Sequence, residues 1–284
     1  MAAFLAPLMT YGPSVYCLTG IPSTTIFPSY IKHVSVAKRL AKDLLPDLFQ
    51  KMKNLRDDIL LIDAAQFNRA DLAEKYLYPA ALGTNFGHSA VICYSQDLEN
   101  VDSDAFRLIC KHEISHLYWG DGLIISLIAF LGTLVGIVAL NALKVYVAWW
   151  LAPAVYCLPF IVGINAYVIA TQFKEGWADA FAADKATPDE LHGICRLLQV
   201  QIEVGKVVHA TSPRIFTKEG NIASDITHLP LTKRLEFFTK ELQDRKIDRQ
   251  EIPAEKVQQL RAFHIRTYEK MFKIKLAHLF PKAS

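Results

Sequence analysis

The sequence predicts a mostly helical α+β protein with a small β-sheet, interrupted by a transmembrane hairpin of two helices. Three observations predict this class. Residues 123–173 carry almost no charge, helical periodicity with capping signals lies on both sides of that stretch, and two short β-rich segments precede it. The 284 residues suffice for one large domain or two modest ones.

The composition narrows the class of protein further. Apolar residues make up 52% of the chain and charged residues only 21%, a balance typical of chains with a membrane segment. The formal net charge of +3 is too small to indicate a nucleic-acid partner. The five cysteines form no C-x-x-C pair, so the sequence predicts no disulfide scaffold and favours a reducing compartment.

Residues 1–84 are expected to form an N-terminal helical region with one short strand. Residues 36–45 and 46–55 have amphipathic helical patterns that are separated at Pro46, where a proline breaks a helix. Residues 59–62 form a short apolar run that indicates a strand.

Residues 85–122 are expected to form the first half of a catalytic domain. Residues 89–94 (SAVICY) are rich in β-forming side chains and indicate a strand. Asp102, Ser103 and Asp104 are alternative N-caps for a helix that continues through His116 to about Trp119.

Residues 123–173 predict the transmembrane hairpin. Lys144 is the only formal charge in this stretch, and the apolar run on each side of it reaches the roughly 20 residues that a helix needs to cross a bilayer. The alternative is a pair of core helices buried on all sides. A hairpin returns the chain to its starting side. The lysines and arginines then predict an integral membrane protein whose site faces the cytoplasm, with the lipid bilayer as a partner.

Residues 174–284 are expected to complete the catalytic domain and to add C-terminal helices. Residues 174–185 form an alanine-rich helical segment. Thr187 and Glu190 then make a capping box, with Pro188 at the first position of a helix that reaches about Val204. Residues 205–227 are polar and predict a loop, whereas residues 231–243 and 253–280 predict helices.

The pentapeptide His112-Glu113-Ile114-Ser115-His116 contains the residue types that bind and use a catalytic metal ion. On a helix, the two histidines share one face and can bind the same ion. Glu113 then lies beside the water that the ion activates, where it can act as the general base. The pentapeptide alone is a weak signal, because a chain of this length contains one by chance in about 1% of cases.

A carboxylate after the apolar stretch supplies the third metal ligand that a catalytic zinc site requires. Glu175 is the first acidic residue after Asp121, and Asp179 follows it by one helical turn. Glu175 is the predicted ligand. Asp179 is predicted to accept a hydrogen bond from one of the ligand imidazoles. The alternative for both carboxylates is an ordinary solvated helix face.

These segments together resemble the membrane zinc metallopeptidases of the HtpX and CAAX-prenyl endopeptidase type. The resemblance rests on residues 112–121 (HEISHLYWGD), the apolar insert, and residues 175–184 (EGWADAFAAD), and it covers about residues 85–235. It implies a zincin-like fold of the gluzincin class. It also implies one Zn²⁺ per chain, held by His112, His116 and Glu175, and protein or peptide substrates associated with a membrane.

A third segment, residues 224–234 (SDITHLPLTKR), resembles the later Thr-His-Pro…Arg element of that family. The resemblance implies that His228 assists catalysis near the metal or the developing oxyanion and that Arg234 braces the site. Leu229 stands between His228 and Pro230 and departs from the pattern. The N-terminal transmembrane helices typical of the family are not expected from this sequence.

Substrate binding is expected at the strand before the metal helix, because such peptidases hold an extended substrate by adding it to a strand. The residues predicted to take part are Asn85, a loose match to the family's Asn-Ala-Phe segment, together with Ser89, Ala90 and Val91.

The predicted function is therefore a membrane-bound zinc metalloendopeptidase, with Glu113 as the general base and His228 as a catalytic helper. The alternative is a catalytically silent membrane adaptor that keeps the fold. A further alternative is an unrelated helical domain for which the apolar stretch is only an anchor, and which binds no metal.

Overall fold

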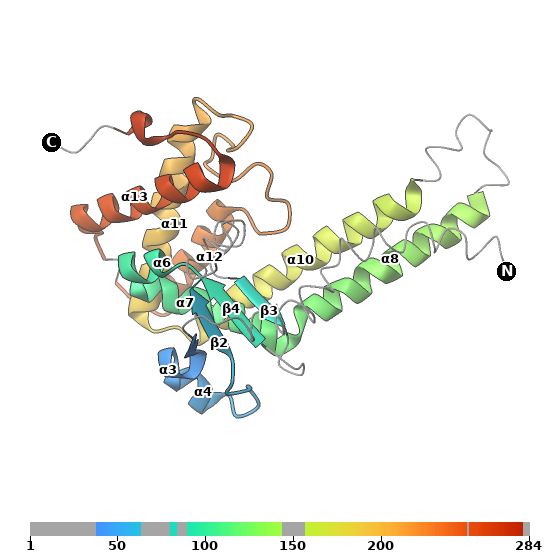
Figure 1. Ribbon diagram of the computed structural model, residues 1–284, viewed down its shortest axis with the longest axis horizontal. Coiled ribbons are helices and arrows are strands. Elements are labelled where there is room, and N and C mark those ends of the chain that lie inside the picture. The colour runs from blue at the N-terminus through green and yellow to red at the C-terminus, as the bar shows by residue number, and fades with distance from the viewer. Residues whose placement is uncertain (1–37, 64–79, 84–89, 144–156, 249, 281–284) are drawn as a thin grey trace.

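The computed structural model describes residues 38–63, 80–83, 90–143, 157–248 and 250–280 (Figure 1). Helices dominate these ranges, which confirms the mostly helical part of the predicted fold class. The helices are α3 (Ala41–Leu44), α4 (Pro46–Lys51), α6 (Gln96–Val101), α7 (Ser103–Trp119), α8 (Asp121–Leu143), α10 (Leu158–Asp184), α11 (Pro188–His209), α12 (Leu231–Asp244), α13 (Ala254–Phe272) and the 3-10 turn η3 (Ala277–Leu279).

The described strands form a mixed four-stranded sheet. They are β1 (Lys38–Leu40), β2 (Leu60–Asp63), β3 (Ala80–Gly83) and β4 (Ala90–Tyr94), in the order β1-β2-β4-β3. β2 and β4 are parallel, and the outer pairs are antiparallel. β4 is buried at every position and paired on both sides, because its run of apolar residues has no polar face to turn toward water. β3 is therefore an edge strand of the described sheet.

Helix α7 is the centre of the fold. It packs against the sheet on one side and against α10 and α11 on the others, and Phe106, Leu108 and Ile114 are completely buried in these contacts. Lys111 is also buried. Its Nζ donates hydrogen bonds to Glu190 Oε2 at 2.5 Å and to the Lys185 carbonyl at 2.8 Å. A buried cation is tolerated in such a core only when it is paired and hydrogen-bonded in this way.

The start of α11 is fixed by the predicted capping box, which the structure confirms. Thr187 Oγ1 accepts a hydrogen bond from Glu190 N at 3.3 Å, and Glu190 Oε2 accepts one from Thr187 N at 2.8 Å. The Glu190 carboxylate is the same group that receives Lys111. The N-terminus of α11 is thereby connected to the middle of α7.

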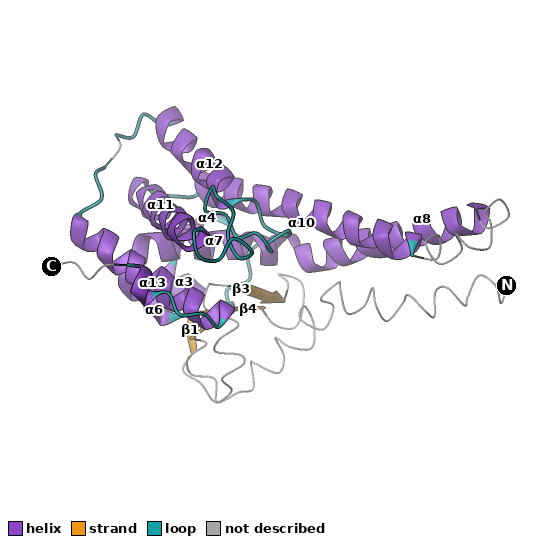
Figure 2. Cartoon of the chain, turned by 90° about the horizontal axis from the view of Figure 1, so that it is seen from above, coloured by secondary structure: helices purple, strands orange, loops and turns teal. Residues whose placement is uncertain are grey.

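Helices α8 and α10 run side by side as an antiparallel pair that extends away from the other described helices and strands, as Figures 1 and 2 both show. We call this pair the arm. Helix α10 is continuous from the arm into the body of the protein. The alanine-rich segment predicted as a separate helix at residues 174–185 is its second half.

The arm does not confirm the predicted transmembrane hairpin. Within the described ranges, no helix combines the length and the apolar character that a membrane crossing requires. The uncharged part of α10, residues 158–173, extends only about 24 Å at 1.5 Å per residue, whereas a bilayer core is about 30 Å thick. The sequence predicted one apolar run on each side of Lys144, and residues 144–156, which include Lys144 and the first part of the second run, lie outside the described residues.

The predicted location in a membrane is contradicted by the same absence of a membrane-spanning helix among the described residues. An integral membrane protein with its site facing the cytoplasm was expected only because a hairpin was expected to cross the bilayer, and that expectation is wrong for the residues described. The bilayer as a partner rested on the same hairpin.

Two further predictions differ from the structure at the ends of the chain. Residues 38–40, predicted as helix, form strand β1, because pairing with β2 outweighs a short amphipathic pattern. The C-terminal helix predicted to reach residue 280 ends at Phe272, where Lys273 takes a left-handed conformation with φ of 55°. Glu269 Oε1 then accepts hydrogen bonds from the backbone N–H groups of Leu276 and Ala277, which fixes the chain after the helix.

The close approach of α11 to α7 yields a stability prediction. A Cβ on Gly193 would lie 2.5 Å from the Ala105 backbone nitrogen and 2.9 Å from Asp104 carbon, so Gly193→Ala must push the two helices apart. We expect a loss of about 1–3 kcal/mol in the free energy of unfolding, measured by urea denaturation.

Gly176→Ala is the matched control, because its Cβ would meet only Leu229 Cδ1 at 3.6 Å. That variant should be neutral or slightly stabilising through helix propensity. A Gly193→Ala protein as stable as the parent would contradict the close packing of α7 and α11.

Candidate metal centre

Helix α7 begins at Asp102, whose Oδ1 caps the helix by accepting a hydrogen bond from Ala105 N at 3.1 Å. Arg196 of α11 holds the same carboxylate through Nε at 3.2 Å. Four turns of regular helix follow, so His112 and His116 lie one above the other on one face. Their rings meet edge to face, and their Nε2 atoms lie 3.1 Å apart.

Helix α7 ends at Gly120, which has φ of 64° and so takes a left-handed conformation that favours glycine. This turn starts α8 at once and directs Asp121 back toward α7. Asp121 Oδ2 accepts a hydrogen bond from His116 Nδ1 at 2.8 Å. The end of the helix therefore supplies the group that orients the second histidine.

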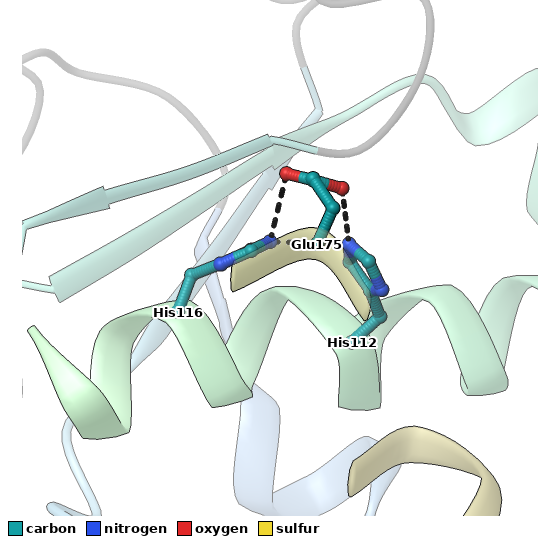
Figure 3. Close-up of side chains that lie close together, drawn as sticks. All are labelled: His112, His116 and Glu175. Atoms are coloured by element: carbon teal, nitrogen blue, oxygen red, sulfur yellow. Dashed lines mark hydrogen bonds and ion pairs between the residues drawn. The ribbon is translucent and has the colours of Figure 1, made fainter. Parts of the chain in front are cut away.

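Glu175 comes to the two histidines from α10. Its Oε2 lies 3.2 Å from His112 Nε2 and its Oε1 lies 3.4 Å from His116 Nε2, so that the carboxylate faces both rings (Figure 3). The side chain is buried, with 8% of its area exposed. The structure thus brings together the two imidazoles and the carboxylate that the sequence predicts as metal ligands.

The three side chains form a group that could hold a metal ion, with one donor atom from each within 4.8 Å of the others. Donors about 2.05 Å from one tetrahedral ion lie about 3.3 Å from each other. The two Nε2 atoms are 3.1 Å apart, and each Glu175 oxygen lies near one of them, Oε2 at 3.2 Å from His112 and Oε1 at 3.4 Å from His116. Glu175 Oε2 is buried and meets no hydrogen-bond donor among the described residues, as expected of an oxygen that faces a cation.

Each histidine is held from behind by an aspartate, and each aspartate by a cation. His112 Nδ1 donates to Asp179 Oδ1 at 2.8 Å, and Arg234 of α12 binds both oxygens of Asp179 at 2.6 and 2.8 Å. Hydrogen bonds at Nδ1 direct the Nε2 lone pairs of both rings toward the centre of the group.

Asp121 has the same role for His116 that Asp179 has for His112, because it accepts the hydrogen bond from Nδ1. Its second oxygen, Oδ1, lies 3.1 Å from Lys174 Nζ. Lys174 directly precedes Glu175 in α10, and its ammonium group also lies 4.9 Å from the centre of the Trp177 ring. One short stretch of α10 therefore supplies both the third ligand and the cation that fixes the partner of His116.

The electrostatics of the group favour a positive charge at its centre. Burial alone would lower the pKa of His112 and of His116, but the carboxylates around each ring outweigh it and raise both pKa values. Burial alone would raise the pKa of Glu175, but the two histidines hold it well below its usual value. The Nε2 atoms are too close to carry two protons directed at each other, so a shared cation matches the geometry better.

The ion pair with Arg234 keeps Asp179 ionised. Burial raises the pKa of this carboxyl, but Arg234 and then His112 lower it to about 2. The pKa of Arg234 is raised in turn, because the attraction of Asp179 outweighs the effect of its burial. Arg234 therefore takes the bracing position that the sequence predicts for it.

Glu113 lies beside the metal group without entering it. Its Oε2 accepts a hydrogen bond at 2.7 Å from the backbone N–H of Ala81 in the edge strand β3. Glu113 is next to His112 in the chain and belongs to the same face of α7 that borders the sheet. Its carboxylate is thus held between the metal ligands and the strand edge.

His228 lies at the open side of the group. Its Nε2 is 3.8 Å from Glu175 Oε1, and its side chain is 52% exposed. Asp225 binds it firmly: Oδ1 lies 2.9 Å from His228 Nδ1 and also accepts a hydrogen bond from the backbone N–H of His228 at 3.1 Å. Burial lowers the pKa of His228, but Asp225 and Glu175 outweigh it, so the pKa is raised.

The residues predicted to bind substrate are placed less favourably. Asn85 and Ser89 lie outside the described residues. Ala90 and Val91 are buried in β4, which already pairs with β2 and β3, so a further strand has no free edge there. The edge near Glu113 belongs to β3, which was not predicted as a strand.

Sequence reasoning missed three residues that support the group. They are Asp121 and Lys174, which hold His116, and Asp225, which holds His228. A signal was present for Asp121, because a glycine that ends a helix directs the next residue back toward the last turn. Asp225 stands three residues before His228, a spacing that suits a local side-chain contact in a turn.

Comparisons of the chain with protein-family models, with curated proteins and with solved structures found no match.

The two aspartates predict how metal affinity depends on residues that do not touch the ion. Asp121→Asn and Asp179→Asn should each weaken binding of a divalent metal ion by about 10- to 100-fold, because the imidazole behind the metal loses its anionic partner. Titration with Co²⁺, followed by its visible absorption, measures this. Asp184→Asn, an exposed position on the same helix, should bind as the parent does. Equal affinities in all three variants would rule out the assigned roles.

Proposed function

We propose that this protein is a zinc-dependent peptidase in which His112, His116 and Glu175 hold the metal and Glu113 is the general base. The single observation that carries the proposal is the meeting of Glu175 with the two histidines of α7, at separations that suit one ion. The resemblance of residues 112–121 and 175–184 to membrane zinc metallopeptidases points to the same chemistry.

The donor set favours zinc among the divalent metals. Two imidazole nitrogens and one carboxylate oxygen are a combination used by catalytic zinc sites, which keep three protein ligands and one open position. Calcium and magnesium prefer oxygen ligands only. When bound, zinc would supply an activated water and polarise the carbonyl of the bond to be cleaved.

The side chains around the metal group have complementary roles in peptide-bond hydrolysis. Glu113 takes a proton from the attacking water and delivers it to the departing amine. His228, on the open side, can donate a hydrogen bond to the oxyanion that develops on the substrate carbonyl. Asp225 sets the orientation of His228, and Arg234 acts only through Asp179.

An extended protein or peptide chain fits the surroundings of the site as substrate. The Ala81 N–H of β3 is directed to Glu113 rather than to β4, so a chain laid along this edge would pass next to the base. Two large apolar side chains are exposed close in sequence to the site: Trp119, 49% exposed and three residues after His116, and Ile226, 55% exposed and two residues before His228. The Ile226 carbonyl is bound by Gln172 of α10. Exposed apolar side chains at this place favour substrates with large apolar residues near the cleaved bond.

The assigned base gives the main test. Glu113→Gln should bind zinc as tightly as the parent and lose peptide cleavage by about 10²- to 10⁴-fold, because the amide cannot accept the proton. Zinc content and cleavage of casein and of a mixed peptide library, with and without chelator, measure the two properties. Glu236→Gln, an exposed position on α12, is the control.

The outcomes of this test separate the candidate functions. A Glu113→Gln protein that cleaves as fast as the parent would show that the base is wrongly assigned. A parent protein that binds zinc but cleaves nothing would favour the catalytically silent adaptor, and a parent that binds no metal would favour the unrelated helical domain.

The contact between Asp225 and His228 gives a second test. His228→Ala should lower kcat by about 10²- to 10³-fold, as loss of an oxyanion donor does. Asp225→Asn should lower it by about 10-fold, with zinc affinity unchanged. If Asp225 acts only through His228, the double variant should be no slower than His228→Ala alone. Additive losses would mean that Asp225 has a separate role.

A further inference from the structure

A cavity of about 120 Å³ lies between α11, α12 and the segment that joins α12 to α13, away from the metal group. Its apolar wall is formed by Leu235, Leu242, Ile247 and Ile252. A space of about 150 Å³ in a protein interior accepts a benzene ring. This cavity is somewhat smaller but partly open to solvent, so that a ring of that size can enter it.

The imidazole of His192 forms a polar end of the cavity and has hydrogen-bonding atoms that no described residue binds. This residue lines the cavity and is only 4% exposed, and none of the described residues forms a hydrogen bond with its ring. Burial, and then the nearby Arg196, lower the pKa of His192, so the imidazole is neutral near pH 7. A neutral imidazole offers one N–H donor and one acceptor. The ring nitrogens of His192 have no partner among the described residues and are not sealed off, so a small molecule in the cavity can reach them.

The charge of the cavity selects a neutral guest. Arg196 is the one cation among the described lining residues, and that guanidinium is already bound by Asp102 at 3.2 and 3.3 Å and lies 3.6 Å from Asp104. An anionic ligand would have to compete with both carboxylates, and a cationic ligand would meet Arg196 itself. The other polar lining groups are uncharged, among them Gln199 and Gln243.

Water is held poorly against the apolar wall of this cavity. A water molecule needs two to four polar partners to be held in place, and the wall made by the leucines and isoleucines offers none. Replacing poorly held water by an apolar group is favourable. A molecule that covers this wall with an apolar ring and forms a hydrogen bond with His192 would contact both the apolar and the polar part of the cavity.

We propose that the cavity between α11 and α12 binds a small, neutral, ring-sized molecule that carries one hydrogen-bonding group, with the ring against the apolar wall and the polar group at His192. The inference does not depend on the proposed peptidase activity. Two lining residues connect the cavity to residues that support the metal group. Leu235 directly follows Arg234, which binds Asp179, and Arg196 binds Asp102, the N-cap of α7.

Phenol is the probe, because it is a benzene ring with one hydroxyl group. Cys195 lines the cavity and carries a free thiol, so its alkylation by N-ethylmaleimide reports occupancy, whereas the exposed free thiol of Cys157 lies outside the cavity and serves as an internal control. Phenol should slow the alkylation of Cys195 at least threefold in a saturable way and leave Cys157 unchanged, as measured by mass spectrometry of the two peptides. Fluorobenzene, which lacks the hydroxyl group, should protect more weakly.

Variants assign the effect to the cavity. His192→Phe should weaken phenol binding about tenfold, whereas His278→Phe, at an exposed position, should not. Thr239→Leu fills the cavity from α12 without removing core atoms and should abolish protection. Saturation-transfer NMR on phenol gives a second reading of binding that does not require Cys195 to react.

Saturable protection that is lost in Thr239→Leu supports the site. Absence of phenol binding by both readings, or equal binding by the parent and Thr239→Leu, would overturn it and leave the cavity to water.

Discussion

The chain of contacts from Arg234 through Asp179 to His112 is the interaction on which the rest of the site depends. It joins three helices that are far apart in the sequence: α12 supplies the arginine, α10 the aspartate and α7 the imidazole. None of these groups is stable alone in a buried place, because an isolated charge or an unsatisfied ring nitrogen is costly there. Together they fix the distance between α7 and α10, and that distance decides whether Glu175 reaches the histidines.

The charges around the cluster explain why a divalent cation suits it. With neutral imidazoles, the groups in contact are four carboxylates, Glu113, Asp121, Glu175 and Asp179, and two cations, Lys174 and Arg234. Four negative charges against two positive charges leave a net charge of −2 in a largely buried region. One divalent ion neutralises that charge, which a proton or a monovalent ion cannot do. The same carboxylates that orient the histidines would thus also attract a divalent metal ion.

The parts of the site that the sequence predicted are those set by local geometry or by a distinctive motif. The helix periodicity placed His112 and His116 together, and the capping box placed the start of α11. Strand β3 and the role of Lys174 escaped, because a four-residue edge strand has little pattern of its own and a cross-helix ion pair has none. Asp121 was missed although the helix-ending Gly120 before it is a signal. The transmembrane hairpin was wrong for the described residues, because a charge-free run in a sequence does not by itself set where its helices begin and end. Hydropathy measures how apolar a segment is, and helix boundaries decide how far it reaches.

The two helices of the arm are joined to the metal centre in different ways. Helix α8 meets α7 at a left-handed glycine, where the backbone changes direction, whereas α10 runs for 27 residues, about 40 Å, from the arm to beyond Glu175 without a break. The connection through Gly120 can change its angle, whereas the connection through α10 is a single rigid helix. A displacement of the far end of the arm would therefore be transmitted along α10, and it would move the carboxylate of Glu175 before it moved either histidine.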